Sequence, residues 1–150
     1  MAQTRDIHGK DVDPAACRVE GRHEMINISK DSVFNLHPID VESVRGEIAS
    51  LLIHGEIVVA AFRTVRDQLV FTNKRIITID VQGMTGARKS YTTLPYSKIQ
   101  FYTIQTPGLV ELVSDSELFL MFSNGFTATF EIRGRCNIVE IGQMISEYVL

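Results

Sequence analysis

The chain has 150 residues, of which 45% are hydrophobic and 22% are charged, and its formal net charge is -3. A chain of this size and composition can bury the core of one globular domain. The slightly negative charge excludes an overall positive field that would draw the protein to nucleic acid or to an anionic membrane. We therefore expect no nucleic-acid partner.

No apolar run approaches the roughly 20 residues that a membrane-spanning helix needs, and the N-terminal stretch lacks the apolar block of a secretory signal. The two cysteines, Cys17 and Cys136, lie far apart and do not have metal-ligand spacing. Such sparse cysteine usage favours a reducing compartment. The sequence predicts a soluble, cytoplasmic protein without a cofactor.

The first 24 residues differ from the rest of the chain. They are polar and charged and show no sustained hydrophobic period, which is typical of a disordered leader or an expression tag. One domain is expected over residues 25–150.

A helix is predicted over residues 40–54. Asp40 is a suitable N-cap and Gly55 a suitable stop. The apolar residues within the helix follow helical spacing and form one stripe: Val41, Val44, Ile48, Leu51 and Leu52. This helix has one face that needs a partner.

From Glu56 the hydrophobic pattern changes to that of strands. Asn124 and Gly125 mark the clearest hairpin, because both residues tolerate the positive φ of a two-residue type I′ turn. Seven strands are expected within residues 56–132, at 56–62, 67–72, 75–81, 89–94, 99–105, 117–123 and 126–132.

A second helix is predicted over residues 138–149, with Asn137 and Glu140 at capping-box spacing. Its apolar stripe is made of Ile138, Ile141, Met144, Ile145 and Tyr148. Seven consecutive strands followed by one helix indicate a mainly β fold of the α+β kind. The expected architecture is a small seven-stranded sandwich or barrel, capped by the C-terminal helix and preceded by an additional helix.

The stretch "GMTGARKS" invites comparison with a phosphate-binding loop. In a Walker-type loop a glycine directly precedes the lysine and a helix follows. Here Arg88 precedes Lys89, and strand-forming residues follow. The "GMTG" part also matches the loop of a KH domain, but that loop joins two helices. Gly83 and Gly86 are therefore predicted to serve a turn between strands.

Catalysis and metal binding find no support in the residue pattern. His37 and His54 lie at opposite ends of the first predicted helix, and no nucleophile, base and acid are arranged together. No cluster has the spacing of zinc or calcium ligands. The sequence predicts no catalytic residue, no metal site and no enzymatic activity.

Several blocks occur in the order known from one protein family. They are Arg66-Asp67 before an apolar strand, "TNKR" at 72–75, "QGMTG" at 82–86 and "PYSKI" at 95–99. In these blocks the chain resembles the short, single-domain bacterial pleckstrin-homology-like proteins, over residues 25–150. The stretch "TPGLVELVSDSEL" departs from the family pattern, which is usually shorter there. The resemblance implies two nearly orthogonal sheets capped by the last helix, symmetric homo-oligomers that are often rings, and no enzymatic activity.

Hairpin register gives an argument about partners. A two-residue turn at Asn124 and Gly125 pairs Met121 with Ala128 and Phe119 with Phe130 on the core face. The opposite face then carries Leu118, Leu120 and Phe122, together with Thr127, Thr129 and Glu131. Either the first helix or a neighbouring subunit is expected to cover that face.

The strand at 56–62 poses the same question, because it is apolar on both faces. Two such strands favour self-association, and closed symmetry would hide their edges. The candidate oligomer interface therefore consists of Ile57, Val59, Ala61, Leu118, Leu120 and Phe122.

The prediction is thus a scaffold that assembles with copies of itself and binds a protein or peptide. The sequence specifies neither this partner nor the number of subunits in the assembly. The alternative is peripheral binding of an anionic lipid headgroup. In eukaryotic pleckstrin-homology domains, basic residues around the first hairpins bind such headgroups, and their counterparts could do so here through charge-assisted hydrogen bonds. These counterparts are Arg63, Arg66, Lys74, Arg88 and Lys89.

Overall fold

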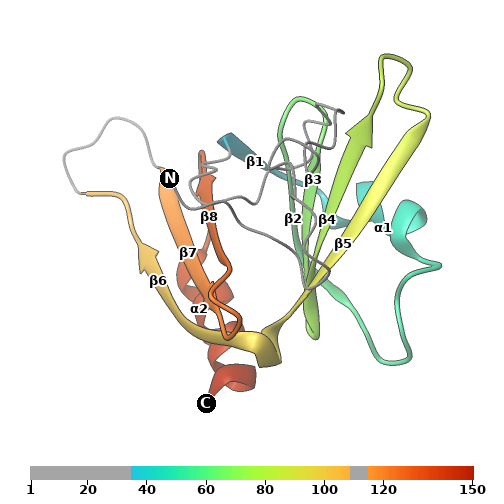
Figure 1. The fold of residues 1–150 in the computed structure, drawn as a ribbon. Helices are drawn as coiled ribbons and strands as arrows, with labels where there is room; N and C mark the ends of the chain where they lie inside the picture. The colour runs from blue at the N-terminus through green and yellow to red at the C-terminus, as the bar shows by residue number, and fades with distance from the viewer. Residues whose placement is uncertain (1–34, 109–114) are drawn as a thin grey trace, which may run out of the picture.

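A computed structural model describes residues 35–108 and 115–150 (Figure 1). The predicted leader over 1–24 and the predicted domain start at Met25 lie outside the described residues. The elements in chain order are β1 (Asn35–Ile39), α1 (Val41–Ile48), β2 (Val58–Arg63), β3 (Gln68–Thr72), β4 (Arg75–Gln82), β5 (Arg88–Pro95), the short 3-10 helix η1 (Tyr96–Lys98), β6 (Ile99–Gln105), β7 (Ser116–Phe122), β8 (Thr127–Ile132) and α2 (Ile138–Val149).

The seven strands expected from the sequence correspond to β2 through β8, and the mainly β fold with a C-terminal helix is confirmed. Sequence reasoning missed β1, because its five residues include Pro38 and show no clean alternation. This short strand joins the two halves of the sheet. It pairs antiparallel with β2 and parallel with β8.

The strands form one sheet in the order β5-β4-β3-β2-β1-β8-β7-β6. Figure 1 shows that the two halves, β2–β5 and β6–β8, face each other across the interior, with β1 at the back. The chain passes from β5 to β6 through η1, so the two strands at the ends of the sheet follow each other in sequence.

The main core lies between the two halves and under α2. Phe62 and Phe71 are stacked edge to face with ring centroids 5.8 Å apart, and Phe71 meets Phe130 in the same way at 6.5 Å. Ile138, Ile141 and Ile145 of α2 belong to the same cluster. The last helix therefore closes the sandwich with its predicted apolar stripe.

Helix α2 approaches the sheet closely at Gly142. The Tyr102 hydroxyl donates a 2.9 Å hydrogen bond to the Gly142 carbonyl, and a Cβ at Gly142 would lie 3.4 Å from Ile104. The predicted cap is also present, because the Asn137 side chain accepts from the Glu140 amide at 3.3 Å. The first contact holds the middle of the helix on β6, and the second caps its first turn.

A second cluster lies on the outer surface of the β2–β4 half. Val44 and Ile48 of α1 pack there against a buried set that consists of Ala61, Val70, Ile77 and Ile79. Strands β3 and β4 are apolar on both faces because the sandwich interior covers one face and α1 the other.

Helix α1 is shorter than the prediction of 40–54. Asp40 caps it as predicted, accepting from the Glu42 amide at 3.0 Å, but the helix ends at Ile48. Beyond that point side chains replace helical backbone partners: the Leu51 carbonyl accepts from Arg75 of β4, and the Ile53 amide donates to the Glu56 carboxylate at 2.9 Å. These partners hold the chain in a non-helical path.

The predicted register of the β7–β8 hairpin is wrong by one residue. Leu120 pairs with Ala128, and Met121 pairs with Thr127. The Phe122 carbonyl accepts from Gly125 at 2.9 Å and the Phe122 amide donates to Phe126 at 2.8 Å, so the loop has three residues instead of two. Gly125, with φ of 82°, provides the left-handed residue that this longer loop requires. This one step moves the side chains of β7 to the opposite face, whereas Ala128 and Phe130 of β8 stay on the core face as predicted.

Candidate interaction surfaces

The predicted interface residues separate into two groups. Leu118 and Leu120 have 0% exposure, Phe122 has 4% and Ala61 has 2%, so these four side chains belong to the two apolar clusters inside the chain's own fold. The sequence placed Leu118, Leu120 and Phe122 outside because the hairpin register was wrong. Neither α1 nor a neighbouring copy covers them, since they face the sandwich interior. Ile57 and Val59 remain exposed, at 58% and 37%.

Ile57 and Val59 lie where β2 extends past its neighbour. Strand β1 pairs with β2 only from Ala61 to Arg63. Within the described ranges, residues 58–60 of β2 have a strand partner on the β3 side alone. We call residues 57–60 the open β2 end. The backbone of Ile57 is bonded to Asn73, whereas residues 58–60 lack a strand partner on the β1 side in the described ranges, and an edge of this kind can pair with another chain.

A hollow of about 250 Å³ adjoins the open β2 end. It lies between the β1–α1 corner and the start of α2, and Ile39, Val41, Val59 and Ile141 are among its lining residues. Cys136 also lines it, and burial raises the pKa of this thiol to about 11. The thiol is therefore neutral at physiological pH, and the hollow is mainly apolar.

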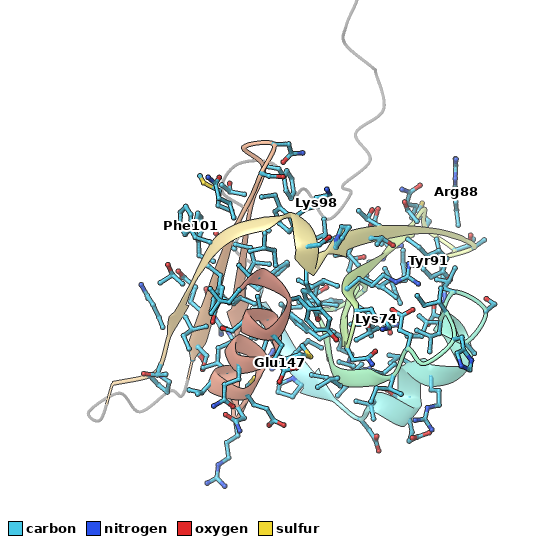
Figure 2. The ribbon with its side chains drawn as sticks, turned by 90° about the horizontal axis from the view of Figure 1, so that it is seen from below. Lys74, Arg88, Tyr91, Lys98, Phe101 and Glu147 are labelled. Atoms are coloured by element: carbon cyan, nitrogen blue, oxygen red, sulfur yellow. The ribbon has the colours of Figure 1, made fainter. Side chains whose placement is uncertain are left out.

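The five basic residues predicted to bind anions do not form one cluster. Arg66 lies on the β2–β3 turn, and Arg88 is the first residue of β5, directly after the β4–β5 turn. The two turns lie at the same end of the sheet, where the Arg66 guanidinium donates to the Gly83 carbonyl. Arg63 ends β2 near these turns. Lys74 lies in the β3–β4 turn at the other end of the strands, and Figure 2 shows it well apart from Arg88.

Lys89 has a charged partner within the same chain. Its ammonium group forms an ion pair with Glu47 of α1, and this hydrogen bond raises the pKa of Lys89. The stretch that first suggested a phosphate loop is a hairpin turn, with Gly83 at φ of 78° and Gly86 at φ of 64°. Both glycines serve the reversal between β4 and β5, as predicted.

A different surface emerges on the C-terminal half of the sheet. In the observed register, nine exposed or half-buried side chains of β6, β7 and β8 lie on the side of these strands that faces away from α2. Figure 2 shows Phe101 on this side. We call this surface the outer face. Across β6, β7 and β8 its three rows are Phe101, Met121 and Thr127; Thr103, Phe119 and Thr129; and Gln105, Glu117 and Glu131.

Sequence reasoning placed Thr127, Thr129 and Glu131 of β8 on this outward side correctly, but the one-residue slip exchanged the two faces of β7. The signal that could have revealed it is Gly125, since a three-residue hairpin loop also ends on a left-handed glycine. With that loop, Phe119 and Met121 would have been assigned to the surface and Leu118 and Leu120 to the core.

Two neighbouring carboxylates of the N-terminal half, the half-buried Asp67 and the buried Asp80, each accept a hydrogen bond within the chain, although the Oδ1 atom of Asp80 is buried and has no partner among the described residues. Asp67 accepts from the Val81 amide at 3.0 Å, and Gln82 donates to Asp80 at 3.1 Å. Burial raises the pKa of Asp67, and the neighbouring Asp80 adds to this effect. Among residues 35–108 and 115–150, no three His, Cys, Asp or Glu side chains are grouped as metal ligands. In the same ranges no helix is both long and apolar enough to traverse a lipid bilayer.

An eight-stranded, strongly bent sheet closed by one C-terminal helix is the architecture of a pleckstrin-homology-like domain. The model of the bacterial PH domain family matches residues 27–149. The chain therefore belongs to the bacterial pleckstrin-homology domain family, as the sequence blocks implied.

Solved structures and one bacterial relative resemble the chain. A DUF1696 family protein with a pleckstrin-homology domain from Shewanella loihica PV-4 is 31% identical, with a TM-score of 0.64 over 78% of this chain and 99% of that one. The pleckstrin-homology domain from Shewanella amazonensis SB2B is 34% identical, with a TM-score of 0.54 over 75% and 90%. Uncharacterized protein YjqA of Bacillus subtilis is 40% identical over 89 residues, or 59% of this chain and 70% of its own length.

Proposed function

We propose that this chain is a non-enzymatic binding module that associates with copies of itself and presents a further surface to a protein or peptide partner. The observation that supports self-association is the open β2 end. It combines an unpaired strand edge, two exposed β-branched side chains and an adjoining apolar hollow.

These three features favour another copy of the chain as the occupant. An incoming strand would satisfy the backbone groups of residues 58–60, and its apolar side chains would cover Ile57 and Val59. Burying a side chain of this size stabilises a contact by about 1.5–3 kcal/mol. A ring with more than two subunits needs two different surfaces that complement each other, so the open β2 end would meet another part of the neighbour.

Light scattering after size-exclusion chromatography tests this proposal. The wild-type protein should have the mass of two or more chains of 16.9 kDa each. Val59→Asp should lower this mass, because a charge would have to be buried in the subunit contact. Val65→Asp is the matched control, since Val65 is fully exposed on the β2–β3 turn.

The control should keep the wild-type mass. If the wild-type chain has the mass of a single subunit, or if Val59→Asp leaves a large assembly unchanged while the protein stays folded, self-association through the open β2 end is wrong.

Lipid binding is the alternative, and the positions of the basic residues favour it less. Lys89 is paired with Glu47, and Lys74 lies in the β3–β4 turn, apart from Arg88 (Figure 2). Of the five predicted residues, this leaves the three arginines at one end of the sheet. Phosphatidylserine vesicles at low salt provide the test. We expect no sedimentation of the protein with them; binding that Arg63→Glu/Arg88→Glu abolishes would establish the lipid function instead.

A further inference from the structure

The outer face carries more negative charge than its surroundings compensate. Glu117 on β7 lies directly opposite Glu131 on β8. Side chains in such a pair are separated by about 5 Å at Cβ, so two carboxylates repel each other. The Nε atom of Arg133 lies 3.4 Å from the Oε1 atom of Glu131. Glu117 has no cationic partner among the residues that the structure describes.

A third carboxylate adds to this charge. Asp115 and both glutamates line a polar hollow of about 230 Å³ at the end of the outer face. The Oδ1 atom of Asp115 is buried and accepts no hydrogen bond from the described part of the chain. Of these three carboxylates only Glu131 has a guanidinium partner in the described part of the chain. An incoming cation would relieve both the repulsion and the missing hydrogen bond.

The other end of the outer face is apolar. Phe101 is 46% exposed, and its ring centroid lies 5.9 Å from that of Phe119. Met121 pairs with Phe101 across the strands and is half-buried. Its flexible thioether side chain adapts to differently shaped partners. This end offers a shallow aromatic surface to a large apolar side chain.

The dimensions of the outer face fit one segment of a protein. Three strands are about 10 Å wide, and the apolar and acidic rows lie about 13 Å apart along the strands. A single α-helix has a diameter of about 10–12 Å and rises about 12 Å in eight residues. We propose that the outer face binds a partner-protein segment that carries Lys or Arg side chains at one end and large apolar side chains at the other.

Charge complementarity distinguishes this occupant from other candidates. Carboxylates repel the phosphates of nucleic acids and of anionic lipids. A second copy of the outer face would place its own carboxylates against carboxylates or against the aromatic rings, and either contact costs desolvation energy. The inference rests on the proposed function, because it specifies the chemistry of the protein partner.

The test uses a labelled synthetic helical peptide with leucines at one end and three lysines at the other, and a matched peptide in which glutamates replace the lysines. Fluorescence anisotropy with the full chain should show binding of the lysine peptide only. Glu117→Gln/Glu131→Gln should raise its Kd about tenfold or more and flatten its salt dependence. Glu140→Gln/Glu147→Gln makes the same charge change on α2, where both residues are exposed, and should alter Kd less than about twofold.

Methionine-methyl NMR locates the peptide. The Met121 signal should shift on titration, whereas the signal of Met84, fully exposed on the β4–β5 turn, should not. Absence of binding by the lysine peptide, equal loss of affinity in both double variants, or a shift at Met84 instead of Met121 would overturn the proposal.

The two proposals fail independently. Glu117→Gln/Glu131→Gln should leave the mass from light scattering unchanged, and Val59→Asp should still bind the lysine peptide. If the wild-type chain is monomeric but binds the peptide at Met121, self-association is refuted while the proposed binding to the outer face stands.

Discussion

The Nε atom of Arg75 on β4 lies 2.9 Å from the Oε1 atom of Glu56, whose side chain is completely buried. The same carboxylate accepts from the Thr72 hydroxyl at 2.7 Å and from the Ile53 amide at 2.9 Å. Burial alone would raise the pKa of Glu56, but these hydrogen bonds outweigh it and lower the pKa. The pair holds the segment between α1 and β2 against the end of the sheet.

Glu56→Gln should therefore lower the free energy of unfolding at pH 7 by about 1.5–3 kcal/mol, which is typical of a lost charge-assisted hydrogen bond. Because the folded-state pKa is lowered, the wild-type chain keeps this stability above the ordinary value of 4.5 and loses it as the pH falls through the folded-state value. Urea denaturation at pH 7 and at pH 3 measures both quantities. A difference between the two chains that does not shrink at low pH would contradict this account.

Asp67→Asn should have the opposite pH dependence. Burial and Asp80 raise the pKa of Asp67, so the wild-type chain loses stability as the pH rises through the folded-state value. Asparagine stays neutral and can still accept from the Val81 amide. The variant should thus gain stability relative to wild type between pH 4 and pH 8, as urea denaturation can measure. An equal difference at both pH values would show that the charge of Asp67 has no such effect.

The corrected hairpin register predicts different costs for two adjacent residues. Leu120→Ala should lower the free energy of unfolding by about 2–5 kcal/mol because it opens a cavity in the core. Met121→Ala, on the outer face, should cost less than about 1 kcal/mol. Thermal and urea unfolding of both variants decide the register, since the two-residue turn would reverse the order.

Two glycines should respond in opposite directions to alanine. Gly125→Ala should destabilise the chain by about 1–2 kcal/mol, because φ at this position is 82°. Gly46→Ala should stabilise it by about 0.5–1 kcal/mol, since Gly46 lies within α1 and nothing lies within 4 Å of the added Cβ. Urea denaturation of each variant measures these changes. Stabilisation by Gly125→Ala would argue against the three-residue loop.

Local pattern was enough for most of the secondary structure. The strand-like runs of β2–β8, and the stripe and cap of α2, depend on neighbouring residues, so they could be predicted from the sequence. The end of α1 could not, because it depends on Arg75 and Glu56, which lie beyond the helix in the chain. β1 was missed because its strand character comes from pairing with both β2 and β8.

Which residues are exposed on the candidate surfaces depended more strongly on the tertiary fold. Ile57 and Val59 were recognised from a strand that is apolar on both faces, and they remain exposed. Leu118 and Leu120 were misplaced because side-chain direction alternates at every residue, so one extra loop residue inverts a whole strand. The sequence contains the alternation of the hairpin and the glycine at its turn. Which face points inward was decided by packing against α2 and β6, because that choice depends on contacts between residues distant in the chain.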